Sequence, residues 1–239
     1  MAILNVTPDS FYAPSRIGGE VELLQAAQGA IRDGAEILDI GACSTRPNSE
    51  PVGEEEEWRR LEPALRALRK EMPDAQLSVD TFRPEIARRA LGQFGRLMIN
   101  DISGGCEEMY EVVRDFQVPY IWTLRGDYDR LKDIDRIADL SLVLDPGLGF
   151  TGGVDNDYRC LCELDMLKAY GLPVLIGVSR KSMLYRLLGV KPEDCLSATQ
   201  VLHLYALQHG ATILRVHDVR EAKQTLTIYE KLNGQTNPQ

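Results

Sequence analysis

The sequence of 239 residues has no long apolar run and no cluster of basic residues. No stretch approaches the roughly 18 apolar residues that a membrane-spanning helix requires, and the first five residues lack the basic leader of a signal peptide. A net charge of −9 argues against a binding surface for nucleic acid or for an anionic membrane. We therefore expect a cytoplasmic protein without nucleic-acid or membrane partners, in which any anionic ligand is held by a local pocket.

Cysteine and histidine are scarce, and neither is arranged as a metal site. The cysteines are odd in number, scattered and without a CxxC pair: Cys43, Cys106, Cys160, Cys162 and Cys195. This pattern argues against a disulfide framework or a zinc site and suits a reducing compartment. His203 and His209 fall on one predicted helix without metal-ligand spacing, and we expect both to be structural.

Short apolar runs alternate with longer stretches of helical period along the whole chain. Strands are predicted at 3–6, 36–40, 76–79, 97–100, 119–124, 140–144, 173–178 and 212–216. Helices are predicted at 20–33, 54–71, 84–93, 107–116, 128–138, 157–170, 193–209 and 219–232. This alternation predicts an α/β fold, a (β/α)8 TIM barrel formed by a single domain over residues 1–239, and the length suits such a barrel.

Two local features carry structural expectations. The acidic run at 54–57 predicts a solvated helix start that is stabilised by the helix dipole and has no function. The first predicted strand follows Met1 directly, so the lower layer of barrel side chains is expected to be exposed, or to be covered by an upstream segment or a partner subunit.

Polar residues follow every predicted strand. They include Asn5, Asp39, Asp80, Asn100, Asp101, Arg125, Asp145, Ser179, Arg180, Lys181, Arg215, His217 and Asp218. Because a barrel brings the carboxyl ends of its strands to one rim, these distant residues are predicted to form one active site. For any single position the alternative is a cap on the next helix, and Asp39 and Asp101 fit either that role or a supporting one behind the site.

Seven of these strand ends together resemble dihydropteroate synthases. The segments are ILNVTPDSF at 3–11, DIGACSTRP at 39–47, VDT at 79–81, INDISG at 99–104, DPGLGF at 145–150, SRKS at 179–182 and RVHDV at 215–219. The resemblance implies an enzyme of folate biosynthesis. It would join 6-hydroxymethyl-7,8-dihydropterin diphosphate to 4-aminobenzoate, releasing pyrophosphate and forming 7,8-dihydropteroate, and it would be inhibited by sulfonamides.

The resemblance also implies how the residues divide between the two substrates. The pterin would be bound by Asp80, Asn100, Asp145 and Lys181. The diphosphate would be bound by Asn5 and Thr45 and by a local cluster of positive charge formed by Arg46, Arg215 and His217. Aminobenzoate would be bound by Pro47, Phe150 and Ser182, with Phe11 as a further wall, although loop packing is the alternative for both phenylalanines. Lys181, Arg215 and Asp145 would be catalytic, and Asn5 would hold Mg²⁺, while Arg180 is expected to lie outside direct contact with substrate. A homodimer is expected through the outer helices late in the chain.

Several positions depart from the family pattern. They are the loop at 12–16, the segment 123–126 in place of a His-containing motif, the short connection from Arg125 to Asp145, and Thr151 to Gly153 in place of a lysine. Two alternatives follow: a methyltetrahydrofolate methyltransferase of similar fold, and a pterin-binding paralogue without turnover. The diphosphate and aminobenzoate residues favour the synthase over both.

Overall fold

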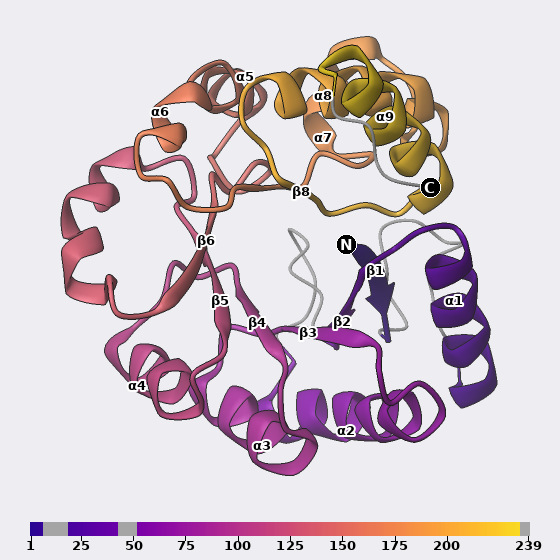
Figure 1. Ribbon diagram of the computed structural model, residues 1–239, viewed down its shortest axis with the longest axis vertical. Coiled ribbons are helices and arrows are strands. Elements are labelled where there is room, and N and C mark those ends of the chain that lie inside the picture. The colour runs from indigo at the N-terminus through magenta and orange to yellow at the C-terminus, as the bar shows by residue number, and fades with distance from the viewer. Residues whose placement is uncertain (7–18, 43–51, 235–239) are drawn as a thin grey trace.

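The computed structural model describes residues 1–6, 19–42 and 52–234, which form a ring of parallel strands surrounded by helices (Figure 1). The strands within this part of the chain are β1 (Ala2–Asn5), β2 (Ile37–Gly41), β3 (Gln76–Asp80), β4 (Met98–Asp101), β5 (Pro119–Thr123), β6 (Ser141–Asp145), β7 (Leu175–Ile176) and β8 (Ile213–Leu214). Each strand lies close to its predicted range, but β7 and β8 are much shorter than expected. The predicted alternation of strands and helices is therefore confirmed.

The eight strands close into a barrel. Strands β1 to β6 form one parallel sheet in sequence order, and β7 pairs with β8. Bridges from Leu144 to Val174 and from Ala2 to Val216 join these two sheets on both sides. At the second junction, the amide of Ile3 donates to the carbonyl of Val216 over 3.0 Å, and the amide of Val216 donates to the carbonyl of Met1 over 2.9 Å. These contacts confirm the predicted (β/α)8 barrel.

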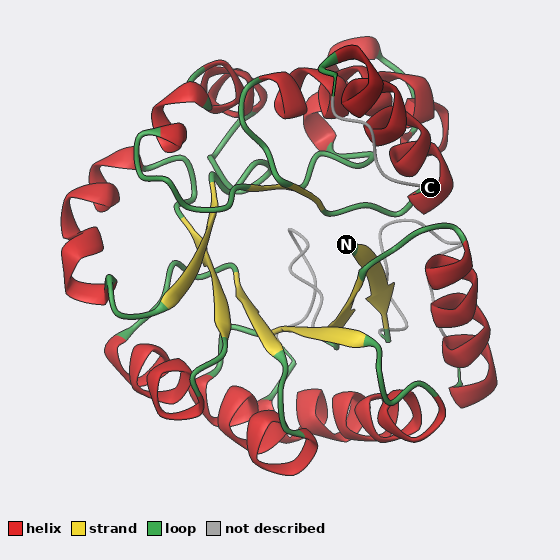
Figure 2. Cartoon of the chain, in the orientation of Figure 1, coloured by secondary structure: helices red, strands yellow, loops and turns green. Residues whose placement is uncertain are grey.

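The helices form the outer layer (Figure 2). Among the described residues they are α1 (Glu20–Arg32), α2 (Glu54–Glu71), α3 (Pro84–Phe94), α4 (Glu107–Phe116), η2 (Tyr128–Ile137), α5 (Val154–Cys162), α6 (Asp165–Lys168), α7 (Ser182–Leu188), η3 (Pro192–Cys195), α8 (Leu196–Gln208) and α9 (Val219–Leu232). Within the same residues, none of these helices combines the length and the apolar character needed to cross a membrane.

Two predicted helices differ from expectation because their buried side chains repeat every three residues. The segment predicted at 128–138 is the 3₁₀ helix η2, in which Leu131, Ile134 and Ile137 face the core. The helix predicted at 157–170 is divided into α5 and α6 by a turn with hydrogen bonds between residues three apart, and Leu161, Leu164 and Leu167 are buried there. A period of three matches a 3₁₀ turn better than an α-helix.

The barrel interior near the amino ends of the strands is filled with apolar side chains. Ile121, Val143 and Leu175 are buried there, and Met1, Met98 and Ile213 pack against them. The expectation of an exposed lower layer is therefore wrong for these buried residues.

Glu57 also departs from expectation, because it is completely buried rather than solvated. Its carboxylate accepts the hydroxyl hydrogen of Thr81 over 2.6 Å and pairs with Arg83, which in turn donates to the carbonyl of Val52 over 2.5 Å. Glu54, Glu55 and Glu56 retain partial or full exposure. The acidic run therefore contains one buried ion pair, which joins the start of α2 to the end of β3.

Candidate active site

The polar residues that follow the strands meet at one rim of the barrel. The guanidinium of Arg215, just after β8, lies 2.6 Å from the carboxylate of Asp80 at the end of β3. At Gly41, which ends β2, a β-carbon would lie 3.5 Å from the side-chain oxygen of Asn5 and 3.6 Å from the carboxylate of Asp80. The predicted convergence of distant residues is confirmed for these positions.

Asp39 links two side chains of the rim, those of Arg215 and Asn100, by hydrogen bonds. It lies in β2, is fully buried, and accepts hydrogen bonds from Arg215 Nε over 2.7 Å and from the amide of Asn100 over 3.1 Å. Asp39 therefore supports two predicted substrate-binding residues, and the supporting role is the one that the structure favours. The predicted strand 36–40 places Asp39 near its carboxyl end, and the observed β2 places it two positions before Gly41.

One guanidinium faces two carboxylates at the centre of the site. Burial raises the pKa of Asp80, Arg215 opposes that rise, and the neighbouring carboxylate of Asp39 adds to it. Burial lowers the pKa of Arg215, but the carboxylates of Asp39 and Asp80 together raise it by more. The pKa of Arg215 is therefore raised overall, and its guanidinium stays charged. Arg215, predicted to bind the diphosphate, is thus in direct contact with Asp80, predicted to bind the pterin.

Two buried oxygen atoms in this network have no hydrogen-bond partner among the described residues, namely Asp39 Oδ1 and Asn100 Oδ1. Asn100 is 2% exposed, so its amide oxygen is removed from bulk water. Buried acceptors normally have donors, and each can be provided by an ordered water or by a ligand N–H group.

The turn after β6 fixes Asp145. The carboxylate accepts the amide hydrogen of Gly147 over 2.8 Å. Gly147 has a φ of 81°, and a β-carbon there would lie 2.6 Å from the Cα of Arg125. Only glycine fits this turn, which holds the carboxylate at the rim. Burial raises the pKa of Asp145, and the ammonium of Lys181 opposes that rise.

Lys181 lies between the turn after β6 and the barrel. Its ammonium donates to the carbonyl of Leu148 and lies 5.2 Å from the ring centroid of Phe150. A β-carbon at Gly177 would lie 3.6 Å from this ammonium and 3.8 Å from the Cβ of Arg215, so the Lys181 ammonium and the base of the Arg215 side chain both lie beside this glycine. Burial lowers the pKa of Lys181 to about 8, although Asp145 opposes the shift. The structure therefore places Phe150 and Lys181 together, as the sequence predicted.

His217 differs from expectation in its charge. Burial, together with the nearby guanidinium of Arg215, lowers its pKa to about 4. The imidazole is therefore neutral near pH 7, and the prediction that it adds positive charge is wrong for the free protein. Its contribution to diphosphate binding would be a hydrogen bond.

Other predicted residues lie as follows. Ser182 begins α7 next to Lys181. His203 is buried and hydrogen-bonded to Gln200, and His209 contacts Asp165 over 2.7 Å. Thr45, Arg46, Pro47 and Phe11 lie outside the described residues.

The segment that replaces the family lysine is folded back onto α5. The hydroxyl of Thr151 and the amide of Gly149 both donate to Asp157 Oδ1 over 2.7 Å. Asp157 is 2% exposed. This carboxylate was not predicted from the sequence, and it fixes the turn that carries Phe150.

A closed parallel barrel with carboxylates, an amide and buried cations at the carboxyl ends of its strands is the arrangement of (β/α)8 enzymes, whose active sites lie at this rim. Residues 1–132 and 124–217 match the model of the pterin binding enzyme family. A dihydropteroate synthase of Synechocystis sp. is 34% identical to this chain over 97% of the chain and 89% of its own length. The chain belongs to this family and, within it, to the dihydropteroate synthases.

Solved structures agree with this assignment. A Yersinia pestis dihydropteroate synthase with a sulfonamide drug complex has a TM-score of 0.89 and 32% identity, covering 98% of this chain and 93% of that one. A Coxiella burnetii dihydropteroate synthase in complex with pteroic acid has a TM-score of 0.87 and 30% identity, covering 97% and 91%.

Proposed function

We propose that this protein condenses 6-hydroxymethyl-7,8-dihydropterin diphosphate with 4-aminobenzoate to give 7,8-dihydropteroate and pyrophosphate in folate biosynthesis. The observation that carries the proposal is the contact of Arg215 with Asp80 at the rim, because it unites the residues proposed for the pterin and for the diphosphate. The related structures with pteroic acid and with a sulfonamide support both halves of the substrate pair and the proposed sensitivity to sulfonamides.

For the pterin, hydrogen-bond chemistry suggests a role for each residue. The amino-pyrimidinone edge presents paired N–H donors, and the carboxylate of Asp145 would accept both. Asn100 would donate and accept with further ring atoms, and its buried amide oxygen has no partner among the described residues. Asp80 would accept from another ring nitrogen, and Lys181 would donate to the ring carbonyl and N5.

The reaction breaks the bond between the pterin methylene carbon and the diphosphate oxygen, and forms a bond from that carbon to the aminobenzoate nitrogen. The nitrogen then releases one proton, to the departing pyrophosphate or to water. The electron-rich pterin can disperse positive charge on the methylene carbon, so a dissociative route needs no strong general base. Arg215, the neutral His217, and Thr45 and Arg46 would hold the departing pyrophosphate. Pro47, Phe150 and Ser182 would position the aminobenzoate ring and carboxylate.

Magnesium is proposed as the cofactor, with Asn5 as its protein ligand. The side-chain oxygen of Asn5 and the carboxylate of Asp80 lie on either side of Gly41, which gives the hard oxygen donors that Mg²⁺ prefers. Within the described residues, no three acidic, histidine or cysteine side chains form a metal cluster. Mg²⁺ suits such a site because it keeps several waters and binds substrate phosphates, and when bound it would neutralise charge on the leaving pyrophosphate.

A single assay tests the proposed function. The purified protein is incubated with both substrates and Mg²⁺, and pyrophosphate and dihydropteroate are quantified together. Equal amounts of both products are expected, with loss of turnover after chelation and inhibition by a sulfonamide. Pterin binding without pyrophosphate release would instead identify a paralogue without turnover, and methyl transfer from methyltetrahydrofolate would identify the methyltransferase alternative.

The lowered pKa of Lys181 predicts a pH dependence of pterin binding. As an ammonium, Lys181 would make charge-assisted hydrogen bonds to the pterin that the neutral amine would not, and burial lowers its pKa to about 8. Affinity of the free protein for the pterin should therefore fall as the pH rises through about 8. Calorimetric titrations between pH 6.5 and 9.5 would measure this fall. In a Lys181→Met variant, affinity should be about 10-fold lower near neutral pH, and the fall around pH 8 should disappear; a fall that persists would assign the titration to another group.

The quaternary state and location are also proposals. Large apolar side chains are exposed on the last three α-helices, including Leu187, Leu188, Val201, Ile228 and Leu232. We propose that this surface forms a homodimer interface, since exposed apolar patches commonly mark such sites. Light scattering of the purified protein would distinguish a dimer from a monomer.

The free cysteines among the described residues support the proposed cytoplasmic location.

A further inference from the structure

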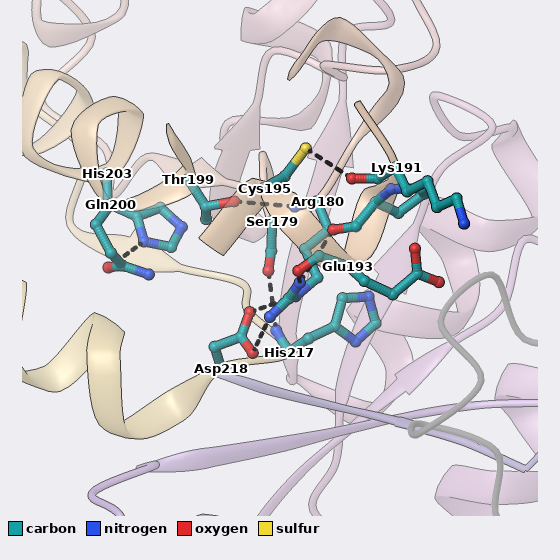
Figure 3. Close-up of polar contacts among 11 residues, drawn as sticks. Ser179, Arg180, Lys191, Glu193, Cys195, Thr199, Gln200, His203, His217 and Asp218 are labelled. Atoms are coloured by element: carbon teal, nitrogen blue, oxygen red, sulfur yellow. Dashed lines mark hydrogen bonds and ion pairs between the residues drawn. The ribbon is translucent and has the colours of Figure 1, made fainter. Parts of the chain in front are cut away.

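Arg180 is a buried cation beside the predicted substrate residues, and its guanidinium is held by groups of the protein itself. It is 7% exposed and has a φ of 54°, in the left-handed region that non-glycine residues seldom adopt. Its guanidinium binds Asp218 in a two-point ion pair, with Nε to Oδ2 at 2.8 Å and Nη2 to Oδ1 at 2.9 Å (Figure 3). The protein itself therefore engages the guanidinium of Arg180 at both ends of the Asp218 carboxylate.

The same side chain also reaches the connection between α7 and α8. Nη1 donates to the carbonyl of Pro192 over 3.0 Å and to that of Glu193 over 2.6 Å. The backbone amide of Arg180 donates to the hydroxyl of Thr199, in α8, over 3.2 Å. Arg180 therefore joins the turn after β7 to η3, to α8 and to the turn after β8.

These two turns carry the groups proposed for different parts of the substrate. Lys181 and Ser182 follow Arg180 directly, and Arg215 and His217 precede Asp218. A second link lies beside the ion pair, because the amide of His217 donates to the hydroxyl of Ser179 over 3.2 Å. The ion pair consequently fixes the distance between the two turns. The turn after β7 carries the groups proposed for the pterin and aminobenzoate, and the turn after β8 carries those proposed for the diphosphate.

We propose that the Arg180–Asp218 pair is a positioning device, which holds Lys181 and Ser182 in register with Arg215 and His217 so that one substrate can engage both turns at once. The inference rests on the proposed function for the identity of the substrate. Its specific consequence is a difference between ligands: a ligand that uses one turn should be indifferent to the pair, whereas a ligand that spans both turns should depend on it.

Three ligands test this difference. 6-Hydroxymethylpterin uses the pterin residues, inorganic pyrophosphate with Mg²⁺ uses the diphosphate residues, and 6-hydroxymethylpterin diphosphate, the oxidised and unreactive form of the substrate, spans both. In Arg180→Met, affinity for the first two should stay within about 3-fold of wild type, while affinity for the third should fall about 30-fold. Turnover should fall with it, and Arg180→Lys, which keeps the charge but loses the two-point geometry, should give an intermediate value.

The double variant Arg180→Met/Asp218→Leu separates positioning from stability. Removal of one partner leaves a buried charge, whereas removal of both is often neutral. The double variant should therefore unfold near the wild-type temperature while retaining the loss for the spanning ligand. Arg114→Met is the matched control, because Arg114 forms a two-point pair with Asp139 at 2.5 and 3.3 Å, is exposed, and belongs to α4; it should leave all three affinities unchanged.

The results that would overturn the proposal are equally specific. Recovery of affinity for the spanning ligand in the double variant would show that only fold stability is at stake. Equal weakening of the binding of all three ligands would also overturn the proposal. So would wild-type affinity for the spanning ligand in Arg180→Met. If the wild-type protein binds these ligands but forms no dihydropteroate, the proposed function fails while the binding comparison still decides the role of the pair.

Discussion

Replacement of Asp145 by asparagine is expected to lower pterin affinity and turnover by about 100-fold or more while leaving the protein at least as stable. Asparagine can still accept the amide hydrogen of Gly147, which the carboxylate now holds over 2.8 Å. However, its NH₂ group would face the paired N–H donors of the pterin, and the charge-assisted bonds would be lost. Each such bond contributes about 1.5–3 kcal/mol, and an unpaired buried donor adds to the loss.

The stability expectation follows from the pKa of Asp145, which burial raises above its usual value. A carboxyl group whose pKa is higher in the folded state destabilises the fold when it is ionised, so removal of its charge relieves that cost at neutral pH. Pterin affinity would be measured by calorimetry, and stability by thermal unfolding. Asp155→Asn is the control, because Asp155 is exposed in α5, the helix that follows the same turn. Wild-type pterin affinity in Asp145→Asn would refute the assigned role.

The position of Asp145 was predictable from sequence because strand ends converge in any parallel barrel. The same reasoning identified Asp80, Asn100, Lys181 and Arg215. In the structure, Arg215 contacts Asp80, and Asn100 contacts Asp39. What the sequence does not provide is the pairing among them. Asp39 binds Arg215 from 176 positions away, and only the closed ring of strands brings the two side chains together.

Two of the errors have a common physical origin in burial. The acidic run at the start of α2 was expected to be solvated, but Glu57 turns inward onto Thr81 and Arg83. His217 was expected to be cationic, but it loses its charge in the low-dielectric rim beside Arg215. The error at η2 has a separate cause, because its apolar residues repeat every three positions, which suits a 3₁₀ helix. Charge patterns along a sequence identify candidate groups, whereas their ionisation depends on neighbours distant in sequence.

Replacement of Arg215 by glutamine is expected to have the largest combined effect on activity and stability. Arg215 is the cation between Asp39 and Asp80, and Asp39 is fully buried. Loss of one member of a buried ion pair typically costs about 3–5 kcal/mol, because the remaining charge is left without compensation. Turnover should fall by about 1,000-fold, since a donor to the leaving pyrophosphate is lost as well.

The pH dependence of this loss provides an internal check. Without the guanidinium, the pKa of Asp80 rises further above its unfolded value, because burial and Asp39 already raise it. The destabilisation relative to wild type should therefore be largest above pH 7, where Asp80 is ionised in the wild-type protein, and should shrink as the pH falls through about 7 and Asp80 becomes protonated in both proteins. Chemical denaturation of both proteins between pH 6 and 9 would measure this trend. A difference that is constant with pH would contradict the proposed electrostatic cause.

A second substitution distinguishes the two functions of Arg215. In Arg215→Gln/Asp39→Asn one buried carboxylate becomes neutral, so much of the lost stability should return. Turnover should not return, because neither glutamine nor asparagine supplies a cation to the pyrophosphate. Recovery of both would mean that Arg215 acts only by neutralising Asp39, and that the leaving group is held by other residues. Recovery of stability alone would show that one guanidinium both neutralises the buried carboxylates and binds the departing anion.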